Sequence, residues 1–397
     1  MTNPQDRPLK IAIFSDSALP ILNGVSVSID ALISGLRSRG HSVHLFTAAH
    51  RGHRDDDPNV IRFYATETPW TKGYPLALPP FYPMIGRFRR QHFDVIHTHT
   101  PFTIGFVGLR WGQSHDIPVV STYHTLYDKY AHYIPFVPKR YLRYKLAKHT
   151  NFYYNQVDQV ITPSAAAKKW LDRHSVKKPV TIIPTGAVSA LTVDRAEARS
   201  QLGIGPNQKV LLYVGRIARE KNMSTLIEAV ALAFREDPNL IFMLVGDGPS
   251  RVECMSLAQE LGIGDRVKFV GFRPRNEVDL FYAAADLFVF ASMTETQGLV
   301  IAEAMTHGLP AIVVQGGGAS AAVIEGKNGV VVRNDPAQFA HEVVSLLRDE
   351  DRFETMSMHA RHSVRSFTRD DMVSAVVSVY RAAMDPSAAP TPQAVLR

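Results

Sequence analysis

Cysteine and long apolar runs are scarce in this chain of 397 residues. Cys254 is the single cysteine, which excludes an internal disulfide and fits a reducing compartment. The longest apolar runs, such as LIFMLV, have the length of a strand, whereas a membrane-spanning helix needs about 20 apolar residues. The opening MTNPQDRP is polar and lacks the apolar centre of a secretory signal. These absences predict a cytoplasmic protein, either soluble or bound to a membrane from one side.

Two common ligand motifs are also missing. No G-x-G-x-x-G follows the first apolar run, which counts against a dinucleotide-dependent dehydrogenase. No group of His, Cys and Asp has the spacing of a metal site. The D-x-D within RDDDP, residues 54–58, has no apolar strand before it, so we interpret it as solvated charge. The sequence therefore predicts no metal site and no bound cofactor.

Basic residues and a normal apolar content are present. Lys and Arg number 44 against 37 Asp and Glu, a formal net charge of +7. This excess favours an anionic partner, either a nucleotide, a phospholipid or a nucleic acid, without choosing among them. An apolar content of 45% with 20% charged residues is typical of a globular protein, and the length favours two domains.

Short β-branched runs alternate with longer amphipathic segments, which is the pattern of parallel sheets with crossover helices. We expect strands within residues 10–16, 42–48, 93–99, 118–124, 159–164, 209–216, 240–248, 266–272, 287–292 and 310–315. We expect helices at 25–40, 224–237 and 250–264. The pattern restarts near Val210 after a polar stretch, so a linker is expected over 186–207. The predicted fold class is α/β with two doubly wound domains.

Three stretches follow predicted strands, where ligands of such sheets bind. Asn23 and Gly24 open a helix, whose amide groups suit a phosphate. Arg216 and Lys221 lie in YVGRIAREKN, where two cations can clamp a diphosphate. His124 ends the run PVVSTYH. The structural alternatives are an ordinary turn, two solvated cations and a structural histidine.

The stretch TETQGLVIAEAM, residues 294–305, places two glutamates around a helix predicted over 298–305. Glu295 lies before the helix and Glu303 inside it, among Leu299, Val300 and Met305. A buried carboxylate is costly without partners, and a sugar or ribose offers pairs of hydroxyls. The alternative is that Glu295 complements the helix dipole and Glu303 is solvated.

Together these stretches resemble glycosyltransferase family 4, retaining enzymes with the GT-B fold. Glu295 and Glu303 match its E-x7-E signature, GRIAREKN its phosphate clamp and NGVS its donor-side glycine loop, over a resemblance that covers residues 9–385. The resemblance implies two Rossmann-like domains facing across a cleft. Their expected limits are 1–190 for an acceptor and membrane-binding domain and 191–370 for a nucleotide-sugar-binding domain. A helix at 371–385 is expected to cross back to the first domain, followed by a disordered tail at 386–397.

The resemblance also implies roles for single residues. Glu303 is expected on the ribose hydroxyls, and Glu295 on the transferred sugar. The predicted catalytic residues are His124, which contacts the sugar near the reacting centre, Glu295, Arg216 and Lys221. The predicted donor-binding residues are Asn23, Gly24, Gly215, Arg216, Lys221, Phe272, Arg273, Glu295, Gln297, Gly298, Leu299, Val300 and Glu303. The implied reaction needs no metal, since cations and a helix N-terminus stabilise the leaving diphosphate.

A finer similarity concerns the acceptor. Residues 97–135, and TETQGLV with Gln297, are similar to bacterial 1,2-diacylglycerol 3-alpha-glucosyltransferases. Independently, residues 129–157 contain no acid. Cations and aromatics alternate there: Lys129, Tyr130, Tyr133, Phe136, Lys139, Arg140, Tyr141, Arg143, Tyr144, Lys145, Lys148, Phe152, Tyr153 and Tyr154. Such a segment suits an anionic bilayer surface, while a packed helix and a nucleic-acid site are the alternatives. The predicted membrane and acceptor residues are Tyr127, Lys139, Arg140, Arg143, Lys145 and Lys148.

The resulting hypothesis is an enzyme at the inner face of the cell membrane that transfers a hexose to a lipid hydroxyl. The expected donor is UDP-glucose, the expected acceptor diacylglycerol, and the product an α-glycoside. The alternatives are a phosphatidylinositol mannosyltransferase, a sulfoquinovosyl-lipid synthase, an enzyme with a soluble acceptor, and a non-catalytic nucleotide-sugar or nucleic-acid binding protein. Val188, Ser189, Ala321 and Ala322 depart from the family's pattern, which leaves the choice of donor open.

Overall fold

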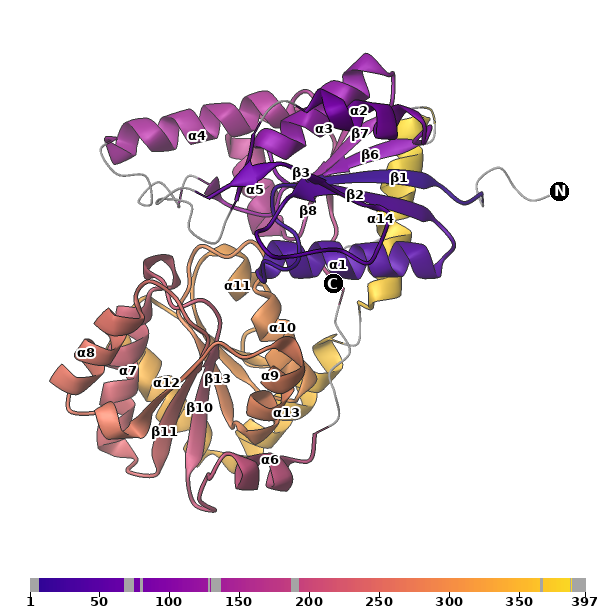
Figure 1. The fold of residues 1–397 in the computed structure, drawn as a ribbon. Coiled ribbons are helices and arrows are strands. Elements are labelled where there is room, and N and C mark those ends of the chain that lie inside the picture. Colours follow the sequence, from indigo (N-terminus) through magenta and orange to yellow (C-terminus); the bar gives the residue numbers. More distant parts are fainter. Residues whose placement is uncertain are drawn as a thin grey trace. The chain divides into compact units, whose positions relative to one another are not determined.

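The computed structural model describes residues 7–67, 75–78, 81–127, 129, 137–186, 193–364, 367–385 and 387. The chain forms two compact units, each built on its own parallel sheet (Figure 1). Unit 1 comprises Met1–Gly186 and Arg369–Arg397, and unit 2 comprises Ala187–Thr368. These limits lie a few residues from the expected boundaries at 190 and 370. The C-terminal helix α14 (Arg369–Met384) belongs to unit 1. The expected tail falls almost wholly outside the described residues.

The sheet of unit 1 has seven parallel strands in the order β3-β2-β1-β6-β7-β8-β9. Their bounds are β1 Lys10–Ser15, β2 Ser42–Ala48, β3 Val60–Phe63, β6 Val95–Thr98, β7 Val119–Thr122, β8 Gln159–Thr162 and β9 Val180–Ile182. The central strands are buried along nearly their whole length, as expected where helices cover both faces of a sheet. A separate antiparallel pair joins β4 Ala65–Thr66 to β5 Leu76–Ala77.

The helices of unit 1 connect these strands. They are α1 Gly24–Ser38, α2 Tyr82–Arg89, α3 Thr103–Ser114, α4 Lys139–Tyr154, α5 Ala165–Arg173 and α14. Helix α1 begins with a capping box, in which the side chain of Asn23 accepts hydrogen bonds from the amides of Val25 and Ser26, and Ser26 Oγ accepts one from the amide of Asn23. Helix α14 packs closely on α1 at Gly35, where a Cβ would lie 2.5 Å from Val373 Cγ2.

The sheet of unit 2 has six parallel strands in the order β12-β11-β10-β13-β14-β15. Their bounds are β10 Lys209–Val214, β11 Leu240–Val245, β12 Val267–Gly271, β13 Leu287–Phe290, β14 Ala311–Val314 and β15 Gly329–Val332. The helices are α6 Arg195–Gln201, α7 Met223–Glu236, α8 Arg251–Glu260, α9 Arg275–Ala284, α10 Leu299–Thr306, α11 Gly317–Ala321, α12 Pro336–Arg348 and α13 Glu350–Ser363. One continuous apolar core joins this sheet to its helices.

The predicted α/β class is confirmed, and each predicted strand is present. Strands β3, β9 and β15, of three or four residues, and the two-residue strands β4 and β5 were not predicted. The linker expected over 186–207 is wrong in its second half, where α6 forms. That helix is polar and buries only Ala198, so its sequence lacks an apolar stripe. Asp194 caps it, and Arg195 donates to the carbonyl of Ala285.

The interpretation of residues 54–58 as solvated charge is also wrong for two of the aspartates. Asp55 receives two hydrogen bonds from Arg62, at 2.6 and 2.8 Å, and these lower the pKa of its carboxyl. Asp57 lies 2.6 Å from Arg37. Both acids therefore serve the packing of unit 1, since their partners lie on β3 and α1.

Within the part of the chain that the structure describes, every helix is too short or too polar to span a bilayer.

Candidate functional site

Each sheet has one point where the strand order reverses, and ligands of such sheets bind beyond the carboxyl ends of the strands there. In unit 2 this point lies between β10 and β13, which are neighbours in the sheet. The loop after β10 carries Arg216 and Lys221, and the loop after β13 carries Glu295. In unit 1 the point lies between β1 and β6. Arg216, Lys221 and Glu295 therefore follow the two strands at the reversal point of unit 2. In unit 1, Asn23 follows β1 and His124 follows β7, the neighbour of β6.

Lys221 and Glu295 form an ion pair at the reversal point of unit 2. The pair is held because Asn222, with a left-handed φ of +58°, ties the two loops together. Its Nδ2 donates to the carbonyl of Ala291, at 3.3 Å, and to Asn334 Oδ1, at 2.7 Å. The side chains of Lys221 and Glu295 are only 14% and 20% exposed. The structure thus brings together two residues that the sequence assigned to one donor site.

The loop that carries Glu295 is held by close backbone packing. Thr294 Oγ1 donates to the carbonyl of Glu220 at 3.2 Å. A Cβ on Gly318 would lie 1.9 Å from the carbonyl oxygen of Thr296, so only glycine fits there. Gly298 adopts a φ of +76° and begins α10 without a side-chain cap. The N-cap position thus supplies no side-chain acceptor to the first amides of α10, which suits an anionic ligand.

Glu303 lies inside α10 and has partners on α9. Tyr282 Oη donates to its Oε2 at 3.0 Å, and Arg275 Nε lies 3.8 Å from its Oε1. The side chain is 15% exposed, so the alternative of a solvated glutamate is wrong. Burial raises the pKa of Glu303, while Arg275 and the hydrogen bond from Tyr282 act in the opposite direction.

A second layer of contacts holds Arg275. Asp279, which is 3% exposed, lies 3.3 Å from Arg275 Nη1 and 2.9 Å from His307 Nε2. The ring of His307 stacks on Tyr282 with centroids 5.5 Å apart. The sequence analysis missed these residues. Their spacing in RNEVDLFY, with Arg275, Asp279 and Tyr282 three or four positions apart, was the available signal, since it puts them on one helix face.

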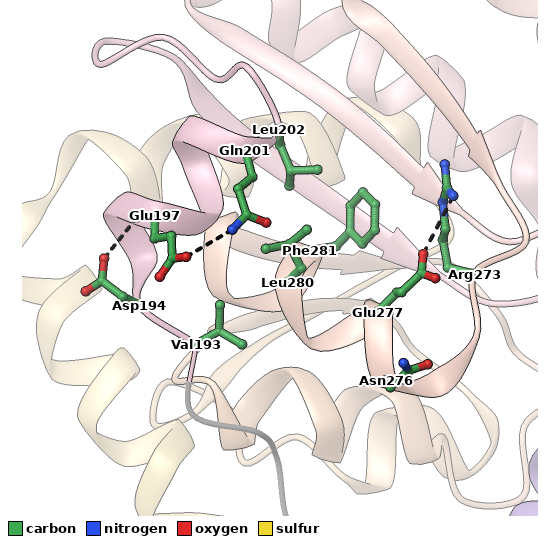
Figure 2. A pocket seen from close by; sticks show the side chains of 10 residues that line it. All are labelled: Val193, Asp194, Glu197, Gln201, Leu202, Arg273, Asn276, Glu277, Leu280 and Phe281. Atoms are coloured by element: carbon green, nitrogen blue, oxygen red, sulfur yellow. Dashed lines mark hydrogen bonds and ion pairs between the residues drawn. The ribbon is translucent and has the colours of Figure 1, made fainter.

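Three other predicted donor-binding residues lie just beyond the ends of β10 and β12. Arg216 and Phe272 are exposed at the ends of β10 and β12. Arg273 lies 3.7 Å from Glu277 and lines a pocket of about 570 Å³ between α6 and α9 (Figure 2). That pocket is lined by Val193, Asp194, Glu197, Gln201, Leu202, Arg273, Asn276, Glu277, Leu280 and Phe281. Apart from Arg273, it contains none of the predicted donor-binding residues.

In unit 1, Asn23 has a clear structural role. Its Oδ1 accepts from the amides of Val25 and Ser26, at 2.9 and 3.0 Å, and its Nδ2 donates to Ser17 Oγ. The hypothesis that the amides after Asn23 and Gly24 suit a phosphate is therefore wrong for these two amides, because the cap already occupies them.

His124 follows β7 and contacts a second histidine. Its Nε2 lies 2.8 Å from Nδ1 of His99, the residue after β6. The ring of His99 lies 4.1 Å from that of His97, which bonds Thr122 Oγ1 and the Tyr380 hydroxyl, each at 2.7 Å. Burial lowers the pKa of His124 to about 4 and that of His97 to about 3. It also holds the pKa of His99 well below its usual value. All three imidazoles are therefore neutral at pH 7.

The sequence analysis missed His97 and His99. Their alternation in HTHT was the available signal, since residues two apart on a strand share one face of the sheet.

The sequence analysis also missed Asp16, at the end of β1. Asp16 accepts hydrogen bonds from the amide of Ile104, at 3.0 Å, and from Thr100 Oγ1. Asp16 thus caps the start of α3 from a neighbouring strand. Burial raises the pKa of its carboxyl.

Helix α4 carries the predicted membrane residues. Lys139, Arg140, Arg143, Lys145 and Lys148 are exposed, as are Tyr141, Tyr144 and Phe152. Tyr153 and Tyr154 are fully buried, so the alternative of a packed helix holds only for its last turn. The predicted Tyr127 lies edge-on to Phe102, with centroids 4.8 Å apart. Tyr130, Tyr133 and Phe136 lie outside the described residues.

A mainly apolar hollow of about 450 Å³ lies beside the exposed cations of α4. Phe102, Lys145, Leu146, Lys148, His149 and Phe152 line it. His149 is held there by a 2.6 Å hydrogen bond to the carbonyl of Pro101. The hollow therefore combines an apolar wall with two lysines, as the surface beneath an anionic lipid would require.

Among the described residues, no three His, Cys, Asp or Glu side chains come together as metal ligands would.

Comparison with known proteins assigns the two units to two sequence families. Residues 22–189 match the family described as Glycosyltransferase Family 4, and residues 194–363 match Glycosyl transferases group 1. The alpha-monoglucosyldiacylglycerol synthase of Acholeplasma laidlawii is 31% identical over 94% of this chain and 96% of its own length. The synthase of that name from Streptococcus pneumoniae is 33% identical over 77% of this chain and 70% of its own. The D-inositol 3-phosphate glycosyltransferase of Nocardia farcinica is 28% identical over 95% of this chain and 90% of its own length.

Solved structures share the fold over nearly the whole chain. A sucrose-phosphate synthase from Thermosynechococcus elongatus has a TM-score of 0.77 and 24% identity, covering 94% of this chain and 98% of its own. The Anabaena protein HepE in complex with UDP-glucose has a TM-score of 0.74 and 20% identity, covering 94% and 100%. The fold is therefore GT-B, and this chain is a glycosyltransferase that belongs to glycosyltransferase family 4.

Proposed function

We propose that this enzyme transfers glucose from UDP-glucose to the free hydroxyl of diacylglycerol and retains the α configuration. The observation that carries the lipid acceptor is helix α4, which is exposed, cationic and free of acids. The names of two relatives that are 31% and 33% identical support the same acceptor. The donor is supported by the Lys221–Glu295 pair and by a fold shared with a protein that binds UDP-glucose.

The residues of unit 2 suit the three parts of a nucleotide sugar. Glu303 would hold the ribose hydroxyls. Tyr282 donates to its Oε2 at 3.0 Å, whereas Arg275 lies 3.8 Å from its Oε1, beyond hydrogen-bond distance. Lys221 and Arg216 would stabilise the diphosphate, together with the uncapped start of α10. Glu295 would contact the sugar. A positive environment of this kind stabilises the leaving UDP without a bound metal.

In the proposed reaction, the bond between C1 of glucose and the β-phosphate oxygen breaks, and its electron pair passes to the phosphate. A bond from C1 to the acceptor oxygen forms on the same face of the sugar. The proton of the acceptor hydroxyl passes to the departing phosphate, so the products are UDP and an α-glucosyl lipid. This route needs no pair of protein carboxylates of the glycosidase kind.

The acid-free surface extends beyond α4. Helices α2 and α3 also contain no aspartate or glutamate. Phe88 of α2 packs on Trp111 of α3, and Phe106 of α3 packs on Phe152 of α4, with centroids 4.9 and 6.4 Å apart. The three helices therefore form one layer over the sheet of unit 1. Each basic residue near an anionic bilayer contributes about 1 kcal/mol, which supports reversible attachment of the enzyme to the inner face of the cell membrane.

A soluble phosphorylated polyol is the second candidate acceptor. Several relatives of about 28% identity are named D-inositol 3-phosphate glycosyltransferase and match this chain over most of its length. The two lysines at the hollow beside α4, Lys145 and Lys148, suit a phosphate as well as a lipid headgroup. An acceptor assay separates the two candidates.

The assay offers UDP-, GDP- and ADP-glucose with either diacylglycerol in anionic vesicles or inositol phosphate in solution. The proposal expects transfer from UDP-glucose to diacylglycerol and an α-anomeric signal in the NMR spectrum of the product. Transfer only to inositol phosphate would establish the second candidate. A β-anomeric product would contradict retention.

The membrane surface is tested with a triple variant, Arg140→Ser, Arg143→Ser and Lys145→Ser. The matched control replaces three exposed cations elsewhere in unit 1: Lys169, Arg173 and Lys177. We expect the first variant alone to sediment poorly with anionic vesicles, with the difference largest at low salt. Equal sedimentation of both variants would refute docking through α4.

Metal independence is tested by chelation. We expect transfer to persist in EDTA at the rate of the untreated enzyme. Complete loss in EDTA with recovery in Mg²⁺ would contradict the proposed role of Lys221 and Arg216 at the diphosphate.

A further inference from the structure

Tyr282 of α9 is a buried tyrosine to which the proposed reaction assigns no task. Its ring is fully buried, stacks on His307 with centroids 5.5 Å apart, and lies 6.1 Å from the ring of Phe288 on β13. His307 is held in turn, because its Nε2 lies 2.9 Å from Oδ1 of Asp279. The hydroxyl of Tyr282 is therefore carried by a ring that is fixed in the core of unit 2.

The hydroxyl of Tyr282 has one proton and two acceptors within reach. Oε2 of Glu303 lies 3.0 Å away, and the carbonyl oxygen of Val300 lies 3.4 Å away. A charged acceptor at the shorter distance makes the stronger bond, so the proton is donated to Glu303. Burial raises the pKa of the Tyr282 hydroxyl well above its ordinary value, so this group is a donor at pH 7.

The other oxygen of Glu303 has a different environment. Arg275 Nε lies 3.8 Å from Oε1, which is beyond hydrogen-bond distance, and no hydrogen bond to Oε1 comes from the residues that the structure describes. Arg275 has a second partner, since its Nη1 lies 3.3 Å from Asp279 Oδ1. The side chain of Glu303 is 15% exposed. Oε1 therefore keeps its capacity to accept hydrogen bonds from a ligand.

We propose that Tyr282 is a positioning residue for the ribose of the nucleotide sugar: it fixes Oε2 of Glu303 and thereby orients the carboxylate to accept the ribose hydroxyls. This inference rests on the proposed function, which assigns Glu303 to those hydroxyls. The physical gain is preorganisation. A glutamate side chain loses rotational freedom when a ligand orders it, and the bond from Tyr282 imposes that order before the ligand binds. Without this bond, the carboxylate can turn toward Arg275 and form a direct hydrogen bond with it.

The test compares the Kd for UDP with the Kd for 2′,3′-dideoxy-UDP, both from calorimetry on the full-length enzyme without an acceptor. The ratio of the two values reports the ribose hydroxyls, because the base and the diphosphate are the same. We expect the wild type to prefer UDP by about ten-fold or more, as hydrogen bonds to a charged group do. Glu303→Gln should lose most of this preference.

The deciding variant is Tyr282→Phe, which removes the hydroxyl and keeps the ring. We expect its preference for UDP to fall about three-fold, because the ligand must now order the carboxylate. Its Kd for dideoxy-UDP should stay at the wild-type value, which also shows that the variant is folded. The double variant with Glu303→Gln should have the preference of Glu303→Gln alone, since Tyr282 acts through Glu303. Equal losses of affinity for both nucleotides would give Tyr282 only a packing role.

The matched control is Tyr153→Phe in unit 1. Tyr153 is also fully buried, and its hydroxyl donates to Thr98 Oγ1 at 2.8 Å and to the carbonyl of Gly105 at 3.0 Å. This variant should keep the wild-type preference for UDP.

The outcomes separate the inference from the proposed function. A wild-type preference in Tyr282→Phe, beside a lost preference in Glu303→Gln, would overturn the inference alone. An unchanged preference in Glu303→Gln, or none in the wild type, would show that Glu303 does not hold the ribose, and the assignment of Glu303 would fall with the inference.

Discussion

At the reversal point of unit 2, a lysine and a glutamate meet beyond the ends of β10 and β13. At the reversal point of unit 1, the ends of β1, β6 and β7 carry Asp16, His99 and His124. Burial shifts the pKa of each of these three residues toward its neutral form. The same strand topology therefore supports a charged site in one unit and a largely neutral one in the other.

The difference between the two sites follows from the groups that contact their buried titratable side chains. In unit 2 the two glutamates of the predicted donor site each have a cation beside them: Lys221 pairs with Glu295, and Arg275 lies near Glu303. In unit 1 the histidines are bonded to hydroxyls and to one another, and burial lowers the pKa of each ring. A charge survives burial only where a partner offsets its loss of hydration. The charged site suits a diphosphate, and the neutral one suits the hydroxyls of a sugar.

The largest expected effect comes from removing the charges in unit 2. Glu295→Gln and Lys221→Met should each lower kcat about 100-fold or more, as the loss of a group aimed at transition-state charge does. The measurement is the initial rate of glucose transfer, alongside the Kd for UDP from calorimetry. Glu295→Gln should change that Kd little. Equal losses of rate and affinity would give Glu295 a structural role.

The control for this pair is Lys168→Met, which breaks the exposed ion pair between Lys168 and Asp172, 3.1 Å apart on α5. Exposed pairs contribute at most about 1 kcal/mol. We expect its kcat to equal that of the wild type.

An intermediate effect concerns the neutral histidines of unit 1. A histidine whose folded pKa is depressed binds its proton more readily in the unfolded chain, so unit 1 should lose stability as the pH falls below 6.5. The loss continues to about pH 4 for His124 and about pH 3 for His97, at about 1.4 kcal/mol per pH unit for each ring. His124→Gln should remove one ring's share of this slope.

The measurement is urea unfolding followed by tryptophan fluorescence. All three tryptophans, Trp70, Trp111 and Trp170, belong to unit 1, so the signal reports that unit alone. The control is His359→Gln, at an exposed histidine of unit 2. An unchanged slope in His124→Gln would show that His124 is not held neutral.

The smallest expected effect is a gain in stability. Burial raises the folded pKa of Glu303, so ionising it costs unit 2 stability as the pH rises through that pKa. Glu303→Gln should therefore raise the melting temperature at pH 8 by a few degrees and by less at pH 5. Its Kd for UDP should rise about ten-fold, since a bond between a ribose hydroxyl and a carboxylate is lost.

Scanning calorimetry at both pH values checks this prediction. Glu277→Gln is the control, because Glu277 is a glutamate of α9 in an exposed pair with Arg273, 3.7 Å away. A loss of stability in Glu303→Gln at pH 8 would mean that Arg275 depends on the charge of Glu303.

Sequence patterns alone predicted the elements that are both long and regular. Strand β2 and helix α7 appear within a residue of their predicted limits, because an apolar run or stripe marks them. Helix α6 was missed because its stability comes from Asp194 and from Arg195 reaching Ala285, 90 positions away. A short polar helix of this kind carries no local signal.

The same division holds within the site. The types of residue in unit 2, two glutamates beside a pair of cations, were readable from the spacing of GRIAREKN and TETQGLVIAEAM. Two features could not be predicted from that spacing. Glu303 is buried against Tyr282 and Arg275, and the side-chain oxygen of Asn23 accepts the hydrogen bonds that cap α1.

By itself, the sequence determined the α/β class, the two doubly wound domains and the family, because strand and helix periodicity and short motifs are properties of neighbouring residues. The tertiary structure decided the state of each titratable group. The pKa values of His97, His99 and His124 fall well below 6.5 because these rings are buried where β6, β7 and α14 meet. Lys221 meets Glu295 only where β10 lies beside β13. The burial and the contacts of these side chains come from strands that are distant along the chain. Burial and contacts together decide whether a titratable side chain stays charged in the folded protein.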